Sequence, residues 1–143
     1  MIREQHILVV EDFDEDFDTV KDAARRASMR HPIVRATSGG EALRMLRSAA
    51  GDNCALPLLL LLDLNTPGED GREVLREIRS SPDLSTLPVI VLSGSANPHD
   101  LNFCYANGAN AYHVKPMNYA KHLQTVQQVF AYWLAGVQLP LPA

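Results

Sequence analysis

Short apolar runs alternate with amphipathic stretches five times along the chain, and this order predicts a parallel sheet covered by helices. The runs expected to form strands are residues 7–10, 32–36, 58–62, 89–92 and 111–114. The third and fourth runs are apolar throughout, as is typical of strands that are buried on both faces. The pattern therefore predicts an α/β fold with a doubly wound, five-stranded parallel sheet and five helices.

Polar residues mark the ends of several expected helices. Ser38 and Glu41 form a capping-box pattern before an apolar-periodic stretch. Asn97, directly before a proline, is typical of a helix N-cap, and Gly108 is typical of the residue that follows a helix. The last helix is expected to run from about residue 118 to about residue 134.

Composition excludes several classes of protein. The 143 residues suffice for one domain with a sizeable core, and the formal charge of −4 argues against binding to a nucleic-acid backbone. No apolar run approaches the ~20 residues of a membrane helix, and the N-terminus lacks the apolar core of a signal peptide. The two cysteines and five histidines show no metal-ligand spacing. We therefore expect a cytoplasmic protein that binds neither nucleic acid nor membranes.

Polar side chains occur where the expected strands end. Glu11 and Asp12 directly follow the first strand, and Asp63 ends the third. Ser93 ends the fourth strand and Lys115 ends the fifth. In an open parallel sheet these strand ends lie on one edge, which is where such folds bind ligands. The sequence therefore predicts that acidic, hydroxyl and basic groups meet in one shallow pocket.

The chemistry of these groups indicates phosphoryl transfer. Clustered carboxylates repel one another unless a cation neutralises them. Oxygen ligands without cysteine or histidine favour a hard ion such as Mg²⁺, which combines few carboxylates with waters and a phosphate oxygen. A serine hydroxyl and a lysine ammonium are suitable donors to the oxygens of a phosphoryl group. Asp63 is then the expected nucleophile, which forms an aspartyl phosphate.

The chain resembles the receiver domain of bacterial response regulators in four fragments that follow the family's order: VVEDFDED, LLLLLDLNTPGEDGREVL, PVIVLSGS and GANAYHVKPM. The resemblance covers nearly the whole chain. It implies the strand order 2-1-3-4-5 that is known from the chemotaxis member of this family. It also implies a phospho-acceptor signalling protein that promotes its own phosphotransfer, not an enzyme, with a sensor histidine kinase as its partner.

A narrower resemblance concerns single-domain regulators of phytochrome-type histidine kinases. It rests on LLLLLDLNTPGEDGREVLREIR and on the closing VFAYWLAGVQLP. This likeness implies that the cognate kinase is of the phytochrome type.

The resemblance to receiver domains implies a set of metal ligands. Asp12 and Asp63 would bind Mg²⁺ directly, Asn65 would add its backbone carbonyl, and Glu11 would act through a water molecule. These are oxygen donors, as Mg²⁺ requires.

The resemblance also implies how the phosphoryl group is held and sensed. Ser93 would bind a phosphoryl oxygen, Lys115 would pair with the phosphate, and Tyr112 stands where the family has its aromatic switch. Gly94 replaces the alanine that is usual after the hydroxyl residue, which should leave the site more open. Family members often have a cis bond at the position of Lys115–Pro116.

Two other classes of protein fit part of the pattern. Phosphohydrolases of the haloacid-dehalogenase type also use an aspartate at a strand end, but their second acid, two residues on, is replaced here by Asn65. Turnover of a small phosphate ester would distinguish this enzyme from a receiver. The other class is a receiver-like protein that only binds partners, which is disfavoured because the acids, the hydroxyl and the lysine are all present.

The end of the chain carries more apolar surface than a receiver helix needs. We expect residues 1–135 to form the receiver domain and residues 136–143 to form a C-terminal extension. Apolar residues recur at helical spacing along one face: Tyr119, Leu123, Val126, Phe130, Trp133 and Val137. The first four can cover the sheet, whereas Trp133 and the tail extend beyond it. We expect a homodimer through the last helix and the tail, with a tail folded back on its own domain as the alternative.

Overall fold

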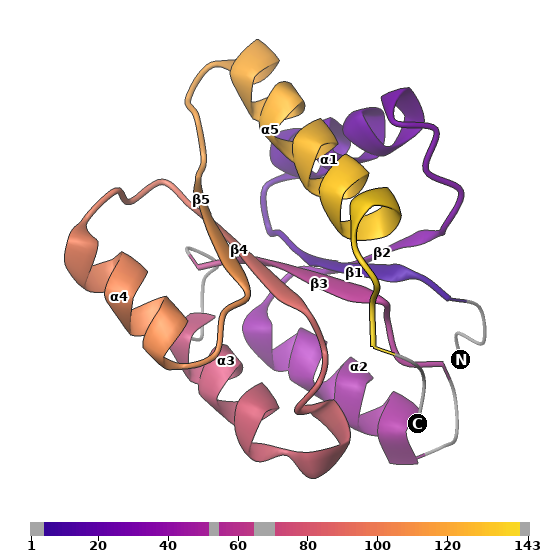
Figure 1. Ribbon diagram of the computed structural model, residues 1–143, viewed down its shortest axis with the longest axis vertical. Coiled ribbons are helices and arrows are strands. Elements are labelled where there is room, and N and C mark those ends of the chain that lie inside the picture. Colours follow the sequence, from indigo (N-terminus) through magenta and orange to yellow (C-terminus); the bar gives the residue numbers. More distant parts are fainter. Residues whose placement is uncertain (1–4, 52–54, 65–70, 141–143) are drawn as a thin grey trace.

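The computed structural model describes residues 5–51, 55–64 and 71–140, which form a five-stranded parallel sheet between two layers of helices (Figure 1). The strands are β1 (Ile7–Val10), β2 (Ile33–Ala36), β3 (Leu59–Asp63), β4 (Val89–Ser93) and β5 (Ala111–Val114). They pair in the order β2-β1-β3-β4-β5. The predicted fold class and strand order are confirmed, and each strand begins or ends within one residue of its expected position.

Helices cover both faces of this sheet. They are α1 (Asp14–Arg26), α2 (Gly39–Gly51), α3 (Gly71–Ser80), α4 (Pro98–Ala106) and α5 (Tyr119–Ala131). A 3₁₀ turn, η1 (Pro82–Leu84), follows α3, and a π-helical turn, η2 (Tyr132–Gly136), extends α5. Helices α1 and α5 pack on one face, while α2, α3 and the buried side of α4 pack on the other (Figure 1).

The core consists of two apolar clusters, one on each face of the sheet. Alternate residues of a strand enter opposite clusters, because successive side chains point to opposite faces. In β3, Leu60 and Leu62 join the cluster under α2 and α3, while Leu59 and Leu61 join the cluster under α1 and α5. All five residues of β3 are buried. The continuous apolar run therefore forms a central strand, as predicted.

Local hydrogen bonds explain where the helices begin and end. Ser38 Oγ accepts the backbone N–H of Glu41 at 3.2 Å, and Asn97 Oδ1 accepts that of His99 at 2.9 Å. Gly108 has a φ of 98° after the end of α4, a left-handed conformation that favours glycine. These three predicted helix ends are confirmed.

The apolar stripe at the end of the chain is divided between core and surface. Leu123, Val126 and Phe130 are buried in the cluster under α1 and α5. Tyr119 is 57% exposed and its hydroxyl donates to Asp22 at 2.8 Å. The prediction that Tyr119 covers the sheet is therefore wrong, because a carboxylate of α1 holds its ring at the surface.

The residues after α5 pack on the domain itself to a larger extent than the sequence indicates. Trp133 is half-buried and contacts the cluster under α1 and α5, although its position in the stripe predicts that it extends beyond the sheet. Tyr132 is 59% exposed and lies edge-on to Trp133 at a ring separation of 5.5 Å.

Within the described residues, no helix has the length and apolar character needed to cross a membrane.

Candidate functional site

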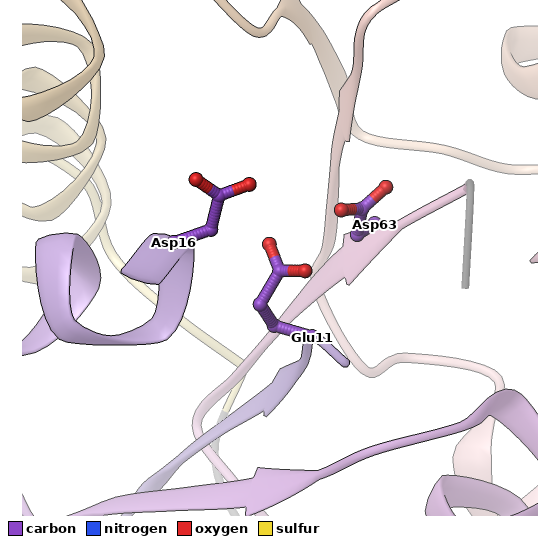
Figure 2. A group of neighbouring side chains, drawn as sticks. All are labelled: Glu11, Asp16 and Asp63. Atoms are coloured by element: carbon purple, nitrogen blue, oxygen red, sulfur yellow. The ribbon is translucent and has the colours of Figure 1, made fainter. Parts of the chain in front are cut away.

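The carboxyl edge of the sheet gathers charged side chains from several elements. Glu11 directly follows β1, Asp63 is the last residue of β3, and Lys115 directly follows β5. The parallel register pairs Val10 with Leu62, so Glu11 comes level with Asp63. Figure 2 shows the carboxylates of Glu11, Asp63 and Asp16, a residue of α1, facing a common centre. One oxygen of each lies within 4.8 Å of the others.

The Lys115 ammonium binds all three of these carboxylates. Its Nζ donates to Glu11 Oε1 at 2.8 Å, to Asp16 Oδ2 at 2.7 Å and to Asp63 Oδ2 at 2.7 Å. A lysine ammonium has three N–H donors, and here each has a separate carboxylate acceptor. The backbone N–H of Lys115 also donates to the carbonyl of Ser93 at 2.6 Å, which fixes the lysine at the end of the sheet.

Burial makes this group of charges electrostatically unfavourable without a further cation. Burial, with a contribution from the negative charge of Asp63, raises the pKa of Glu11 from 4.5 to about 7, although the hydrogen bond from Lys115 opposes this shift. Burial also disfavours the ammonium of Lys115, but its hydrogen bonds to Asp16, Asp63 and Glu11 dominate and raise its pKa above the ordinary value. One ammonium neutralises only one of three carboxylates. The site therefore has a surplus of negative charge.

The donor set suits a hard divalent cation. The group that could hold an ion among the described residues is Glu11, Asp16 and Asp63, which offers carboxylate oxygens alone. Oxygen ligands without histidine or cysteine are those that Mg²⁺ and Mn²⁺ accept. The residues present therefore fit a divalent ion of this type.

The structure places one of the predicted metal ligands, Asp12, apart from this group, and another, Asn65, is not among the described residues. Asp12 is exposed and is not a member of the carboxylate cluster. Asp16 is a member of the group instead, although the strand-end pattern in the sequence does not single it out. A signal was available, because α1 begins at Asp14 and an acid in its first turn lies beside the strand end.

The predicted hydroxyl and aromatic residues are linked through one backbone segment. Ser93 is buried, and its Oγ accepts the backbone N–H of Ser95 at 3.1 Å. Tyr112 is half-buried, and its hydroxyl donates to the carbonyl of Ser95 at 2.8 Å. Ser95 therefore connects the two residues. The described residues contain no cis peptide bond, so the Lys115–Pro116 bond is trans.

Comparison with known proteins identifies the class to which this fold and site belong. A family model described as the response regulator receiver domain matches residues 7–127. The chain belongs to this family of signalling proteins. The resemblance seen in the sequence is confirmed.

Individual relatives indicate which kind of response regulator this chain resembles. Response regulator Rcp1 of Synechocystis sp. is 37% identical over 135 residues, which cover 94% of this chain and 92% of Rcp1. A crystal structure of the Mn²⁺-bound form of Rcp1 has a TM-score of 0.89 at 36% identity, covering 96% of this chain and 99% of that chain. The phosphorylated cyanobacterial phytochrome response regulator RcpA has a TM-score of 0.89 at 37% identity, with the same coverage. This response regulator is closely related to regulators that act with phytochromes.

Proposed function

We propose that this response regulator accepts a phosphoryl group on Asp63 from the phosphohistidine of a sensor histidine kinase, in a reaction that requires Mg²⁺. The observation that carries the proposal is the placement of the Asp63 carboxylate at the end of β3, 2.7 Å from the Lys115 ammonium and inside an acidic group. Phytochrome-type kinases are the proposed donors, since RcpA, a cyanobacterial phytochrome response regulator, matches this chain along nearly its whole length.

The proposed step transfers the phosphoryl group from nitrogen to oxygen. A carboxylate oxygen of Asp63 attacks phosphorus, the bond between phosphorus and the histidine nitrogen breaks, and an aspartyl phosphate forms. Lys115 and the hydroxyl of Ser93 donate to the phosphoryl oxygens as negative charge spreads over them. In this way the protein promotes its own phosphorylation without turning over a substrate.

Mg²⁺ would be held by Asp12, Asp63 and the Asn65 carbonyl, with Glu11 acting through water, as in the family pattern. When bound, the ion supplies positive charge that offsets repulsion between the carboxylates and the incoming phosphoryl group. The surplus negative charge of the site and the carboxylate oxygens of Glu11 and Asp63 support a divalent ion at this position. The Mn²⁺-bound form of Rcp1 supports a divalent ion in a related protein.

Phosphorylation should alter the hydrogen bonds that connect Ser93 to Tyr112 through Ser95. The phosphoryl group offers the Ser93 hydroxyl a charged acceptor, and hydrogen bonds to charged groups contribute about 1.5–3 kcal/mol. Ser93 Oγ now accepts from Ser95, whose carbonyl binds the Tyr112 hydroxyl. A shift of Ser93 would therefore be transmitted to Tyr112. We propose that this coupled pair is the switch that carries the signal to protein partners.

We further propose that two copies associate through the end of α5 and the tail, with residues 1–135 as the receiver domain and 136–143 as an extension. The exposed Tyr132 and the half-buried Val137 and Leu139 leave apolar surface at this end of the chain. Apolar surface of this kind is typical of an interface.

Phosphorylation by a sensor kinase would place the protein in the cytoplasm.

Phosphorylation of the full chain by acetyl phosphate tests the main proposal. The wild-type protein should be labelled in Mg²⁺ and unlabelled in EDTA, as measured by intact mass or by a Phos-tag gel. Asp63→Asn should remain unlabelled, whereas Asp18→Asn, an exposed acid of α1, should behave as wild type. Equal labelling of Asp63→Asn would overturn the assignment. Sustained turnover of a small phosphate ester would instead indicate a hydrolase.

A further inference from the structure

Asp16 is the one member of the carboxylate group without a role in the proposed reaction. It lies in the first turn of α1, whereas Glu11 and Asp63 come from strand ends. Its Oδ2 accepts from Lys115 Nζ at 2.7 Å, as close as the bond from Lys115 to Asp63. In Figure 2 its carboxylate faces those of Glu11 and Asp63 from the side of the helix.

A buried histidine limits the space around this carboxylate. His122 of α5 is 4% exposed, and its Nδ1 lies 4.0 Å from Asp16 Oδ1. Its Nε2 has no hydrogen-bond partner among the described residues. Burial, together with the nearby Lys115, lowers the pKa of His122, which favours the uncharged ring. The ring therefore packs beside Asp16 on the side of α5, and the other carboxylate oxygen of Asp16 accepts from Lys115.

The geometry of Lys115 explains what this contact can contribute. A lysine side chain is flexible, with a compact charge on four carbons. Of its three acceptors, Asp63 is the proposed nucleophile and Glu11 belongs to the proposed metal group, so both would change partners during the reaction. Asp16 lies within the acidic group but is not one of the proposed Mg²⁺ ligands, so it can keep one N–H of the ammonium while another turns to the phosphoryl group.

We propose that Asp16 is a positioning residue for the phosphorylation of Asp63, which holds the Lys115 ammonium beside the acceptor carboxylate. The inference rests on the proposed function. Because catalytic groups that are held in place act far better than free ones, loss of this contact lowers the rate of transfer itself. Loss of this contact should leave the affinity for Mg²⁺ nearly unchanged.

The test measures rate and metal affinity separately on the full chain. With acetyl phosphate and saturating Mg²⁺, Asp16→Asn should lower the maximal rate of Asp63 labelling about tenfold. The affinity for Mg²⁺, from calorimetric titration without the phosphodonor, should change by less than about threefold. Asp16→Glu, which keeps the charge, should label at a rate within about threefold of wild type. Asp18→Asn, which removes an exposed acid from the same helix, is the matched control and should behave as wild type.

A second comparison separates positioning from a general structural effect. In a Lys115→Ala background, Asp16→Asn should lower the residual rate no further, since the residue it positions is absent. Three results would overturn the proposal. They are an unchanged rate in Asp16→Asn, an equal loss in both backgrounds, and a tenfold loss of Mg²⁺ affinity with the rate restored at saturating Mg²⁺. Wild-type protein that is not labelled on Asp63 would overturn the proposed function, and the positioning role with it.

Discussion

Lys115 Nζ lies 2.7 Å from Asp63 Oδ2, although β4 separates the strands that carry the two residues. The lysine side chain crosses the end of β4 to reach the carboxylate. Its backbone N–H donates to Ser93 at the end of that strand. The contact therefore joins three strand ends in one polar layer above the core. The Lys115 ammonium therefore offsets negative charge on the acceptor carboxylate.

Removal of the ammonium should destabilise the metal-free protein. Lys115→Ala leaves the buried carboxylates of Glu11 and Asp63 without their shared cation, which is costly in a partly desolvated site. We expect the free energy of unfolding in EDTA at pH 8 to fall by about 1–3 kcal/mol, since solvent reaches part of the site. Urea denaturation provides the measurement, with Lys121→Ala, an exposed lysine of α5, as the control. Equal stability of Lys115→Ala and wild type would contradict the expectation.

Stability should also depend on pH through Glu11. Its pKa is about 7 in the folded protein and 4.5 in the absence of the fold. The unfolded chain therefore releases this proton first, and the folded state loses stability as the pH rises from about 4.5 to 7. Glu11→Gln removes this titration. In EDTA the variant should gain stability relative to wild type over this range, by about 1–2 kcal/mol at pH 8. A difference in unfolding free energy that is constant between pH 5 and pH 8 would exclude this role of Glu11.

The affinity for Mg²⁺ should depend on Asp12 but not on the nearby acid Asp14. If Asp12 turns inward to bind Mg²⁺, Asp12→Asn removes a direct carboxylate ligand and should weaken the ion's affinity by about tenfold or more. Asp14→Asn removes an exposed acid at the start of α1, which pairs with Arg35, and serves as the control. Calorimetric titration measures both. An unchanged affinity in Asp12→Asn would mean that Asp12 stays at the surface, where the structure places it.

The proposed switch can be followed with beryllofluoride, a mimic of the phosphoryl group. Its addition with Mg²⁺ should change amide NMR signals from Ser93 through α4, because Ser95 links Ser93 to Tyr112. Tyr112→Phe removes the hydrogen bond to Ser95 and should reduce the changes in α4 while leaving those next to Asp63. Changes confined to the neighbourhood of Asp63 in the wild type would rule out the switch.

The oligomeric state depends on the surface around Tyr132 in this proposal. Tyr132→Glu places a charge on the exposed apolar end of α5 and should convert the expected dimer into a monomer at tens of micromolar. Light scattering of the full chain measures the mass. Gln124→Glu adds the same charge to an exposed position of α5 and should leave the dimer intact. A wild-type chain that is monomeric under these conditions excludes the dimer.

The sequence predicts the sheet edge well because strand ends are local features. Asp63 and Ser93 each end a continuous apolar run, and Lys115 follows another, so parallel pairing brings them together without knowledge of any loop. The same reasoning did not single out Asp16, because a helix residue reaches the site only through the docking of α1 beside β1. That docking depends on the packing of α1 against α5, so the acidic first turn of α1 indicates a nearby strand end but not which of its acids reaches the site.

The tail shows a second limit of pattern reasoning. Helical spacing assigns Trp133 to the stripe formed by Phe130 and Val126, but it assumes a uniform α-helix. The helix becomes a π-helical turn from Tyr132 onwards. Trp133 nevertheless contacts the core beside Phe130, as its place in the stripe indicates, and Tyr132 is exposed. The expectation that failed concerned length, because the domain covers more of this helix than the pattern shows.

The burial of β3 determines how slowly its amide protons exchange with solvent compared with those of α4. Asp63 ends a strand whose five residues are all buried, whereas Cys104 is the buried residue of α4. Local opening is least costly where few apolar contacts are lost. Amide protons of β3 should therefore exchange with solvent only when the whole domain unfolds, while those of α4 exchange through openings confined to that helix. The acceptor would be anchored in the slowest-exchanging element, while α4, which packs on β5 and α3, can open without it.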